Sequence, residues 1–549
     1  MPTLHGNIAG LKSSQVKALE RIYSRRIPPD SLVTPDLARF LTELSYDIRR
    51  QIGILVDRQG AISHVIIGDD REIYIPELSR FRITGAGLRG LRCIHTHLRG
   101  EQLSQDDLTD LALLRLDMMV ALAVEENGLP GTVHYAHLLP PNPENKSVEV
   151  LRAASIHTLD LNFEQFLRSL DVEIERKVSE TVDLSDTREK AILISVSQSS
   201  RAETEDSLDE LTELARTADV VVLDRVIQRP RKLNPKYLMG EGKIKEVVIS
   251  AMQQGATLLV FDQNLSPMQA SNISAITEIK VIDRSQLILD IFARRAHTLD
   301  GKVQVELAQL KYILPRLTGR GTAMSRLAGG IGGRGPGETK LEVDRRRIRD
   351  RIARLEKQLK NLSKGRKQRR RKRGRSDLPI VSIVGYTNAG KSTLLNALTQ
   401  SKVLTEDLLF ATLDTATRRL RFPMEREVII TDTVGFIRQL PKSLFGAFTA
   451  TLEELEDADL LLHVVDISNP RFEQQIASVE QILSDLDLGM IPRLLVFNKT
   501  DRIPSEEIAP YCRRFEAVPV SALDRKTFEP LMHEMADRFW PEEMEPLDE

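Results

Sequence analysis

The spacing of apolar residues changes several times along the chain, and each change marks a different kind of structure. In residues 1–180, two apolar runs at 51–57 and 61–67 flank a Gly-containing turn, which predicts a β-hairpin. The run Leu91–His97 predicts another strand, and we expect an amphipathic helix to follow over Gln105–Glu125. This part of the chain is therefore predicted to be an α+β unit.

From residue 190 the pattern becomes a regular alternation of β-rich apolar runs and amphipathic helices. This alternation predicts a small parallel sheet with helices on its faces, over residues 185–299. The predicted strands are 191–196, 220–223, 257–261 and 280–283, and the predicted helices are 207–218 and 242–253. Gly240 and Gly242 open the second helix, so they either bind an anion, such as a second nucleotide, or simply start the helix.

Residues 300–375 carry narrow apolar stripes on otherwise charged helices. The stripes predict two long helices packed as an antiparallel hairpin arm. Their members are Val303, Leu307, Leu310, Leu314 and Leu317 in the first helix, and Leu341, Ile348, Ile352, Leu355, Leu359 and Leu362 in the second.

The arm is predicted to end in a flexible basic tip. Its connection Thr318–Gly337 contains eight glycines, three arginines and no acid, and nine of the twelve residues Lys364–Arg375 are basic. A disordered connector and a solvated charge run would explain each stretch separately. Because the basic tip, helix and linker are consecutive, we favour a surface that binds nucleic acid. Such a surface would recognise the phosphate backbone and the shape of the nucleic acid.

The composition fits a multidomain protein of a reducing compartment. A chain of 549 residues is expected to form several domains, and residues 376–549 are predicted to be the fourth. Two cysteines argue against a disulfide framework. The first residues lack a signal-peptide pattern, and no apolar run reaches the ~18 residues of a membrane span. We therefore expect a cytoplasmic protein.

Residues 385–393 fit the phosphate-binding pattern G-x-x-x-x-G-K-[ST], and apolar runs at 380–384 and 394–398 supply the strand and helix that it requires. Backbone N–H groups are expected to cradle the phosphates. Lys391 would reach the β- and γ-phosphates, and Ser392 would ligate Mg²⁺. The predicted phosphate-binding residues are Gly385, Tyr386, Thr387, Asn388, Ala389, Gly390, Lys391 and Ser392.

Two further stretches are predicted to sense the γ-phosphate. Thr412 is expected to ligate Mg²⁺ only when that phosphate is present, Asp432 to hold Mg²⁺ through water, and the Gly435 N–H to contact the phosphate. Lys391, Thr412 and Gly435 are therefore the predicted catalytic residues, and Ser392 and Thr412 the metal ligands. The two stretches are Phe410, Ala411, Thr412, Leu413 and Asp414, and Asp432, Thr433, Val434 and Gly435.

Two loops near the end of the chain are predicted to select the base. The Asp501 carboxylate can accept hydrogen bonds from guanine N1–H and the exocyclic amine, whereas adenine offers no such donor pair. Backbone N–H groups around Ala522 would meet guanine O6. The predicted base-binding residues are Asn498, Lys499, Thr500, Asp501, Ser521, Ala522 and Leu523, so the expected nucleotides are GTP and GDP.

Two residues predict how hydrolysis is controlled. Phe436 stands where Ras-like enzymes carry the glutamine that orients water, so we expect slow intrinsic hydrolysis and help from another residue or a partner. Asn388 resembles the loop asparagine of K⁺-dependent GTPases, which indicates K⁺ as a further cofactor.

These motifs resemble the HflX family of ribosome-associated GTPases over roughly residues 185–540. The stretches Met239–Lys243, Gly329–Glu338 and Asp432–Phe436 carry much of the resemblance. It implies an α/β multidomain GTP hydrolase that binds the large ribosomal subunit and its rRNA and splits, rescues or recycles stalled ribosomes under stress. We expect a monomer, associated with ribosomes or the membrane periphery.

His95, His97 and Asp107, with Ser104 between them, resemble the zinc site of JAMM/MPN isopeptidases. The gap from His97 to Asp107 is one residue shorter than that family's usual spacing, and the preceding hairpin carries no obvious glutamate base. The alternative interpretation of these residues is a related fold that binds no metal.

Two alternative functions follow from these patterns. One is a GTPase in ribosome biogenesis or RNA modification that splits no ribosomes. The other is a metallo-isopeptidase regulated by GTP, with residues 1–180 as its catalytic part.

Overall fold

The computed structural model describes residues 3–76, 78, 81, 87–140, 142, 146–181, 186–317, 340–373, 378–399, 416–422, 426–432, 435–436 and 455–541. Contacts group the chain into two compact units, Met1–Gln198 with Val221–Leu259 and Gln269–Val281, and Ser199–Val220 with Val260–Met268 and Ile282–Glu549. The predicted fold class, a multidomain α/β protein, is confirmed. The four domain boundaries stay predictions.

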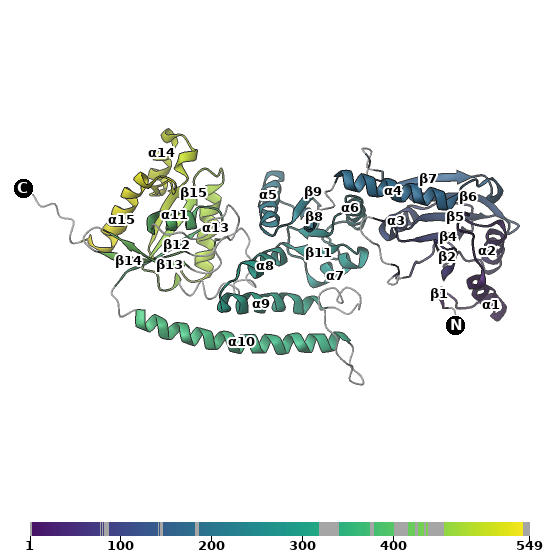
Figure 1. Ribbon diagram of the computed structural model, residues 1–549, viewed down its shortest axis with the longest axis horizontal. Helices are drawn as coiled ribbons and strands as arrows, with labels where there is room; N and C mark the ends of the chain where they lie inside the picture. The colour runs from purple at the N-terminus through teal and green to yellow at the C-terminus, as the bar shows by residue number, and fades with distance from the viewer. Residues whose placement is uncertain are drawn as a thin grey trace, which may run out of the picture. The chain divides into compact units, whose positions relative to one another are not determined.

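A seven-stranded mixed sheet forms the centre of residues 3–181 (Figure 1), in the order β1-β3-β2-β4-β5-β6-β7. Its strands are β1 Leu4–Gly6, β2 Ile52–Asp57, β3 Ile62–Ile67, β4 Leu91–His97, β5 Met118–Val124, β6 Pro130–Leu138 and β7 Val148–Ala153. The accompanying helices are α1 Ser13–Arg21, α2 Pro35–Ile48, α3 Gln105–Leu114 and α4 Phe163–Thr181. The predicted hairpin is confirmed, because β2 and β3 pair antiparallel.

The helix predicted over Gln105–Glu125 is wrong in its second half. α3 ends at Leu114, Arg115 takes a left-handed backbone conformation with φ 49°, and Met118–Val124 form β5 instead. Every residue of β5 is buried, which fits a central strand covered on both faces. A continuous apolar run has no alternation, so periodicity could not distinguish this strand from a buried helix.

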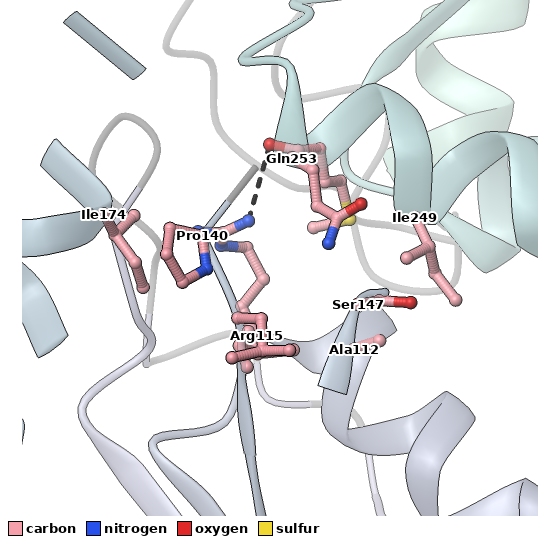
Figure 2. Close-up of a pocket in the computed structure, with 10 residues that line it drawn as sticks. Ala112, Arg115, Pro140, Ser147, Ile174, Ile249 and Gln253 are labelled. Carbon is pink, nitrogen blue, oxygen red and sulfur yellow. Dashed lines mark hydrogen bonds between the residues drawn. The ribbon is translucent and has the colours of Figure 1, made fainter. Parts of the chain in front are cut away.

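A small pocket in the first unit is lined mainly by α3, the β6–β7 connection, α4 and α6 Glu241–Gln253 (Figure 2). Arg115 reaches into it and donates a hydrogen bond to the Met252 carbonyl at 3.4 Å. Burial lowers the pKa of Arg115 to about 10, so its guanidinium is still charged at neutral pH. The described residues that line the pocket carry mostly apolar side chains, and none of them is a carboxylate.

A four-stranded sheet follows in the chain, with order β11-β10-β8-β9 and with β8 and β9 parallel. Its strands are β8 Lys190–Val196, β9 Val221–Gln228, β10 Leu258–Phe261 and β11 Lys280–Asp283. The helices of this part are α5 Arg201–Thr217, α6, α7 Pro267–Ile276 and α8 Arg284–Arg295. The predicted alternation of strands and helices is therefore present, and α6 starts directly after Gly240.

The two predicted arm helices, α9 Leu299–Ile313 and α10 Lys340–Arg373, lie side by side in Figure 1. Val303, Leu307 and Leu355 are the buried residues of their contact, as the apolar stripes predict. Ion pairs between Arg351 and Glu306 at 2.7 Å and between Lys311 and Glu356 at 2.7 Å flank this contact. The predicted tip Thr318–Gly337 lies outside the described residues.

A six-stranded sheet, β13-β14-β12-β15-β16-β17, organises the C-terminal part of the chain. Its strands are β12 Ile380–Gly385, β13 Ala416–Arg421, β14 Glu427–Asp432, β15 Leu460–Asp466, β16 Arg493–Asn498 and β17 Val518–Pro519. The helices are α11 Lys391–Thr399, α13 Phe472–Asp485, α14 Ser505–Phe515 and α15 Glu529–Phe539. All neighbouring strands are parallel except β13 and β14, so the carboxyl ends of five strands meet at one edge.

No helix among the described residues is both long enough and apolar enough to span a membrane.

Candidate nucleotide-binding site

The predicted phosphate loop joins β12 directly to α11. β12 is apolar and nearly all buried, and α11 begins at Lys391 immediately after Gly390. Gly390 has φ 90°, and a Cβ at this position would lie 2.2 Å from the Asn498 amide nitrogen. Only glycine therefore fits between the loop and β16.

The Lys391 side chain lies inside the predicted phosphate loop. Its Nζ donates to the Tyr386 carbonyl at 2.8 Å, and the side chain is buried. Burial lowers the pKa of Lys391 to about 8, although the nearby Asp432 carboxylate acts in the opposite direction. A poorly solvated ammonium held by one carbonyl is suited to pair with phosphate oxygens.

Ser392 and Asp432 meet beside the start of α11. The Ser392 hydroxyl donates to the Asp432 carboxylate at 2.6 Å, and Asp432 is fully buried at the end of β14. A hydroxyl and a carboxylate are oxygen ligands of the kind that Mg²⁺ prefers. The donor set therefore fits the predicted metal, with Ser392 as ligand and Asp432 next to it.

Asn498 connects the phosphate loop with the base-binding loops. Its amide nitrogen donates to the Ala389 carbonyl at 2.8 Å, and its amide oxygen accepts from the Ala522 N–H at 3.0 Å. Nearby, Ser521 donates to the Asp501 carboxylate at 2.6 Å, and Lys499 pairs with Asp466 at 2.7 Å. The predicted base-binding residues thus come together at the end of β16.

The described structure brings together part of the predicted site. Thr387, Lys391 and Gly435 lie close together, because a Cβ at Gly435 would lie 2.8 Å from Lys391 Nζ and 2.8 Å from Thr387 Cγ2. The Thr500 hydroxyl donates a hydrogen bond to the Val520 carbonyl at 2.9 Å, and the Leu523 side chain is exposed. The predicted residues Phe410, Ala411, Thr412, Leu413, Asp414, Thr433 and Val434 lie outside the described residues.

Phe436 is a core residue that also pairs with the phosphate loop. Its N–H donates to the Gly385 carbonyl at 3.0 Å, and its carbonyl accepts from the Thr387 N–H at 2.7 Å. Its ring is 5% exposed, in an apolar cluster with Val384 and Tyr386. The side chain at 436 is therefore used for packing.

Phe436→Gln is expected to leave hydrolysis slow, because the new amide would be buried in that cluster. Burial of an unpaired amide in place of a phenyl ring should lower the free energy of unfolding by about 2–4 kcal/mol. Phosphate release and denaturant unfolding would measure the two effects, with Phe436→Leu as the apolar control. A faster GTPase in the glutamine variant would contradict this.

Tyr386 forms a contact that no sequence pattern predicts. Its hydroxyl donates to the Glu210 carboxylate of α5 at 2.5 Å. Glu210 also pairs with Arg284 at 2.9 Å, and Arg284 pairs with Asp262 at 2.6 Å. The phosphate loop is thus bonded to a buried charge network formed by residues some 100 or more positions earlier in the chain.

Tyr386→Phe should remove this bond and keep the ring in place. A hydrogen bond to a charged group contributes about 1.5–3 kcal/mol, so the free energy of unfolding should fall by about that amount. Tyr511→Phe is the matched control, since its ring packs edge-on against Phe472. Equal losses in both variants would show that the bond to Glu210 contributes nothing.

A glycine-rich loop between strand and helix, a buried lysine beneath it and an aspartate in the base loop define the class: this is a P-loop protein built to bind guanine nucleotides. Three family models match successive stretches of the chain. They are described as "GTP-binding GTPase N-terminal" over residues 205–293, "GTP-binding GTPase Middle Region" over 295–373 and "50S ribosome-binding GTPase" over 380–499.

Named relatives agree with these matches. The chain is 50% identical over 328 residues to "GTPase HflX" of Caldanaerobacter subterraneus, covering 60% of this chain and 76% of the relative. It is 45% identical over 325 residues to "GTPase HflX" of Escherichia coli, covering 59% and 76%. The chain therefore belongs to the HflX family of GTPases, and it is a GTP hydrolase.

Among solved structures, the chain is similar to a GTP-binding protein from the hyperthermophilic archaeon Sulfolobus solfataricus in complex with GDP. The identity is 24%, the TM-score is 0.36, and the match covers 64% of this chain and 98% of that one.

Proposed function

We propose that this GTPase binds the large ribosomal subunit through the α9–α10 arm and splits or recycles ribosomes, with GTP as the switch. In this proposal Lys391 and Gly435 contact the phosphates, and Ser392 and Thr412 hold Mg²⁺. The protein acts as a monomer in the cytoplasm. The family description "50S ribosome-binding GTPase" supports the choice of partner.

The charge of α10 is the observation that carries the proposal. This helix contains seventeen basic and four acidic residues, and in its described side chains only Leu355 is buried. Arg349 and Arg354 are exposed. Because each phosphate contact releases counterions, such a surface favours RNA over a protein partner of ordinary charge.

Cosedimentation of the full chain with large subunits tests the proposal. We expect binding with a non-hydrolysable GTP analogue, weaker binding with GDP, and a steep loss of binding as salt rises. The double reversal Arg349→Glu/Arg354→Glu should weaken binding, whereas Arg513→Glu/Arg538→Glu, which reverses exposed charges on α14 and α15, should not. Absence of the chain from the subunit fraction in both nucleotide states would exclude the proposed partner.

A second assay on assembled ribosomes distinguishes splitting from biogenesis. Splitting predicts that ribosomes dissociate into subunits when the protein and GTP are added. Binding to free large subunits without dissociation would instead favour a role in subunit assembly or RNA modification.

Asn388 supports K⁺ as an additional cofactor. It takes a left-handed conformation with φ 60° and is exposed in the phosphate loop, so its side chain is accessible to an ion at the phosphates. GTP hydrolysis is therefore expected to be faster in K⁺ than in Na⁺ buffer, and Asn388→Ala should remove the difference. Equal rates of the unaltered protein in the two salts would exclude K⁺.

A further inference from the structure

Three side chains of types that can ligate a metal meet between strand β4 and helix α3, far along the chain from the nucleotide site. His95 and His97 are alternate residues of β4 and share one face of the sheet, and Asp107 lies in the first turn of α3. One ligand atom from each lies within 4.8 Å of the others. The two histidines are buried and the Asp107 side chain is 14% exposed, so solvent reaches the cluster from the Asp107 side.

The proton on His97 is placed by its surroundings. His97 Nδ1 lies 3.0 Å from the Glu101 carbonyl, which can only accept, so Nδ1 carries the hydrogen. In the neutral ring, Nε2 then presents a lone pair, and it faces His95 Nε2 at 2.9 Å and the Asp107 carboxylate at 3.6 Å. The buried lone pair of His97 Nε2 therefore needs either a hydrogen donated by His95 or a cation that it shares with His95 and Asp107.

Asp107 is oriented by its own helix start. The Ser104 N–H and hydroxyl both donate to one Asp107 oxygen at 2.7 Å, and the other oxygen lies 3.3 Å from His95 Nε2. Partners that fix a ligating carboxylate and the far nitrogen of a ligating histidine are the usual support of a metal site.

We propose that His95 Nε2, His97 Nε2 and the Asp107 carboxylate bind one divalent transition-metal ion, with Zn²⁺ as the best match, and leave one coordination position open to water. Two imidazoles and a carboxylate suit zinc better than Mg²⁺, which prefers oxygen ligands.

The distances agree with this assignment. Two ligand atoms about 2.0–2.1 Å from a tetrahedral ion lie about 3.3 Å apart. The His95–Asp107 separation already has that value, and the His95–His97 separation of 2.9 Å needs to open by only a few tenths of an ångström. Three protein ligands around a tetrahedral ion leave the fourth position for water, as in catalytic rather than structural zinc sites.

Metal analysis of the full chain tests the proposal. Protein stripped with a chelator, reloaded with Zn²⁺ in excess Mg²⁺ and desalted should retain about one zinc per chain. His97→Ala and Asp107→Asn should each lose it. His134→Ala, which removes a buried histidine from β6 of the same sheet, should keep it.

Cobalt provides a readout that is independent of variant folding. Co²⁺ bound to the unaltered chain should give the strong visible absorption of a tetrahedral site, and added Zn²⁺ should abolish it. Less than about 0.2 zinc per unaltered chain, or a Co²⁺ spectrum of octahedral type, would overturn the proposal in favour of a proton shared by the three side chains. Retention of zinc by a folded His97→Ala/Asp107→Asn double variant would also overturn it.

Discussion

Replacing Lys391 with alanine is expected to abolish GTP binding. The Lys391 ammonium is buried, and its only described hydrogen bond is to the Tyr386 carbonyl at 2.8 Å. Phosphate oxygens would pair with it at low dielectric, where loss of one charged partner costs about 3–5 kcal/mol. Affinity for GTP should therefore fall by more than about 100-fold.

Titration with a fluorescent GTP analogue would measure this loss in the full chain. Lys526→Ala, which removes an exposed lysine from the same domain, should leave the affinity within about twofold. The fold should survive Lys391→Ala, because burial already disfavours the charged lysine, as its lowered pKa indicates. A folded Lys391→Ala protein that still binds GTP like the parent chain would refute the assignment of this loop.

The sequence predicted best those features that are set by neighbouring residues. The strand, glycine loop and helix around Gly390 follow from three local features. These are a short apolar run, a glycine in a backbone conformation that residues with side chains rarely adopt, and a helix start. The apolar stripes with Val303 and Leu307 in α9 and Leu355 in α10 could be predicted in the same way, because a helix repeats its apolar positions at fixed spacing. Both depend on local geometry.

Features that depend on distant parts of the chain could not be predicted. Tyr386 and Glu210 are 176 positions apart, and neither lies in a pattern that signals the other. The structural role of Asn498 cannot be read from the sequence for a related reason, since its bonds to Ala389 and Ala522 depend on how three loops converge. The error at Met118–Val124 arose because burial in the centre of a sheet removes the alternation that identifies a strand.

The role of Asn498 links the two halves of the nucleotide site. One side chain holds the phosphate loop through Ala389 and the base loop through Ala522. Displacement of either loop therefore strains a bond to the other. Base recognition and phosphate binding are consequently expected to change together, whereas a substitution of Asp501 alone should affect only the base.

Asp501→Asn is accordingly expected to change which base the nucleotide site prefers. In the parent chain both carboxylate oxygens are acceptors, matching the N1–H and exocyclic amine of guanine, and Ser521 orients one of them at 2.6 Å. The asparagine keeps one acceptor and turns the other into a donor, which faces the guanine amine unfavourably. Affinity for GTP should fall by at least about 100-fold, since a buried polar group loses its partner.

The affinity for xanthosine triphosphate should rise as the affinity for GTP falls. Xanthine carries a carbonyl at the position of the guanine amine, and this carbonyl can accept a hydrogen bond from the asparagine amide. Competition titrations with GTP, xanthosine triphosphate and ATP would measure the exchange, with Asp537→Asn on the exposed face of α15 as the charge-matched control. Lys391 and Ser392 are untouched, so the variant should bind the new nucleotide with Mg²⁺ dependence like that of the parent. A parallel loss of both nucleotides would mean that Asp501 supports the loop and does not contact the base.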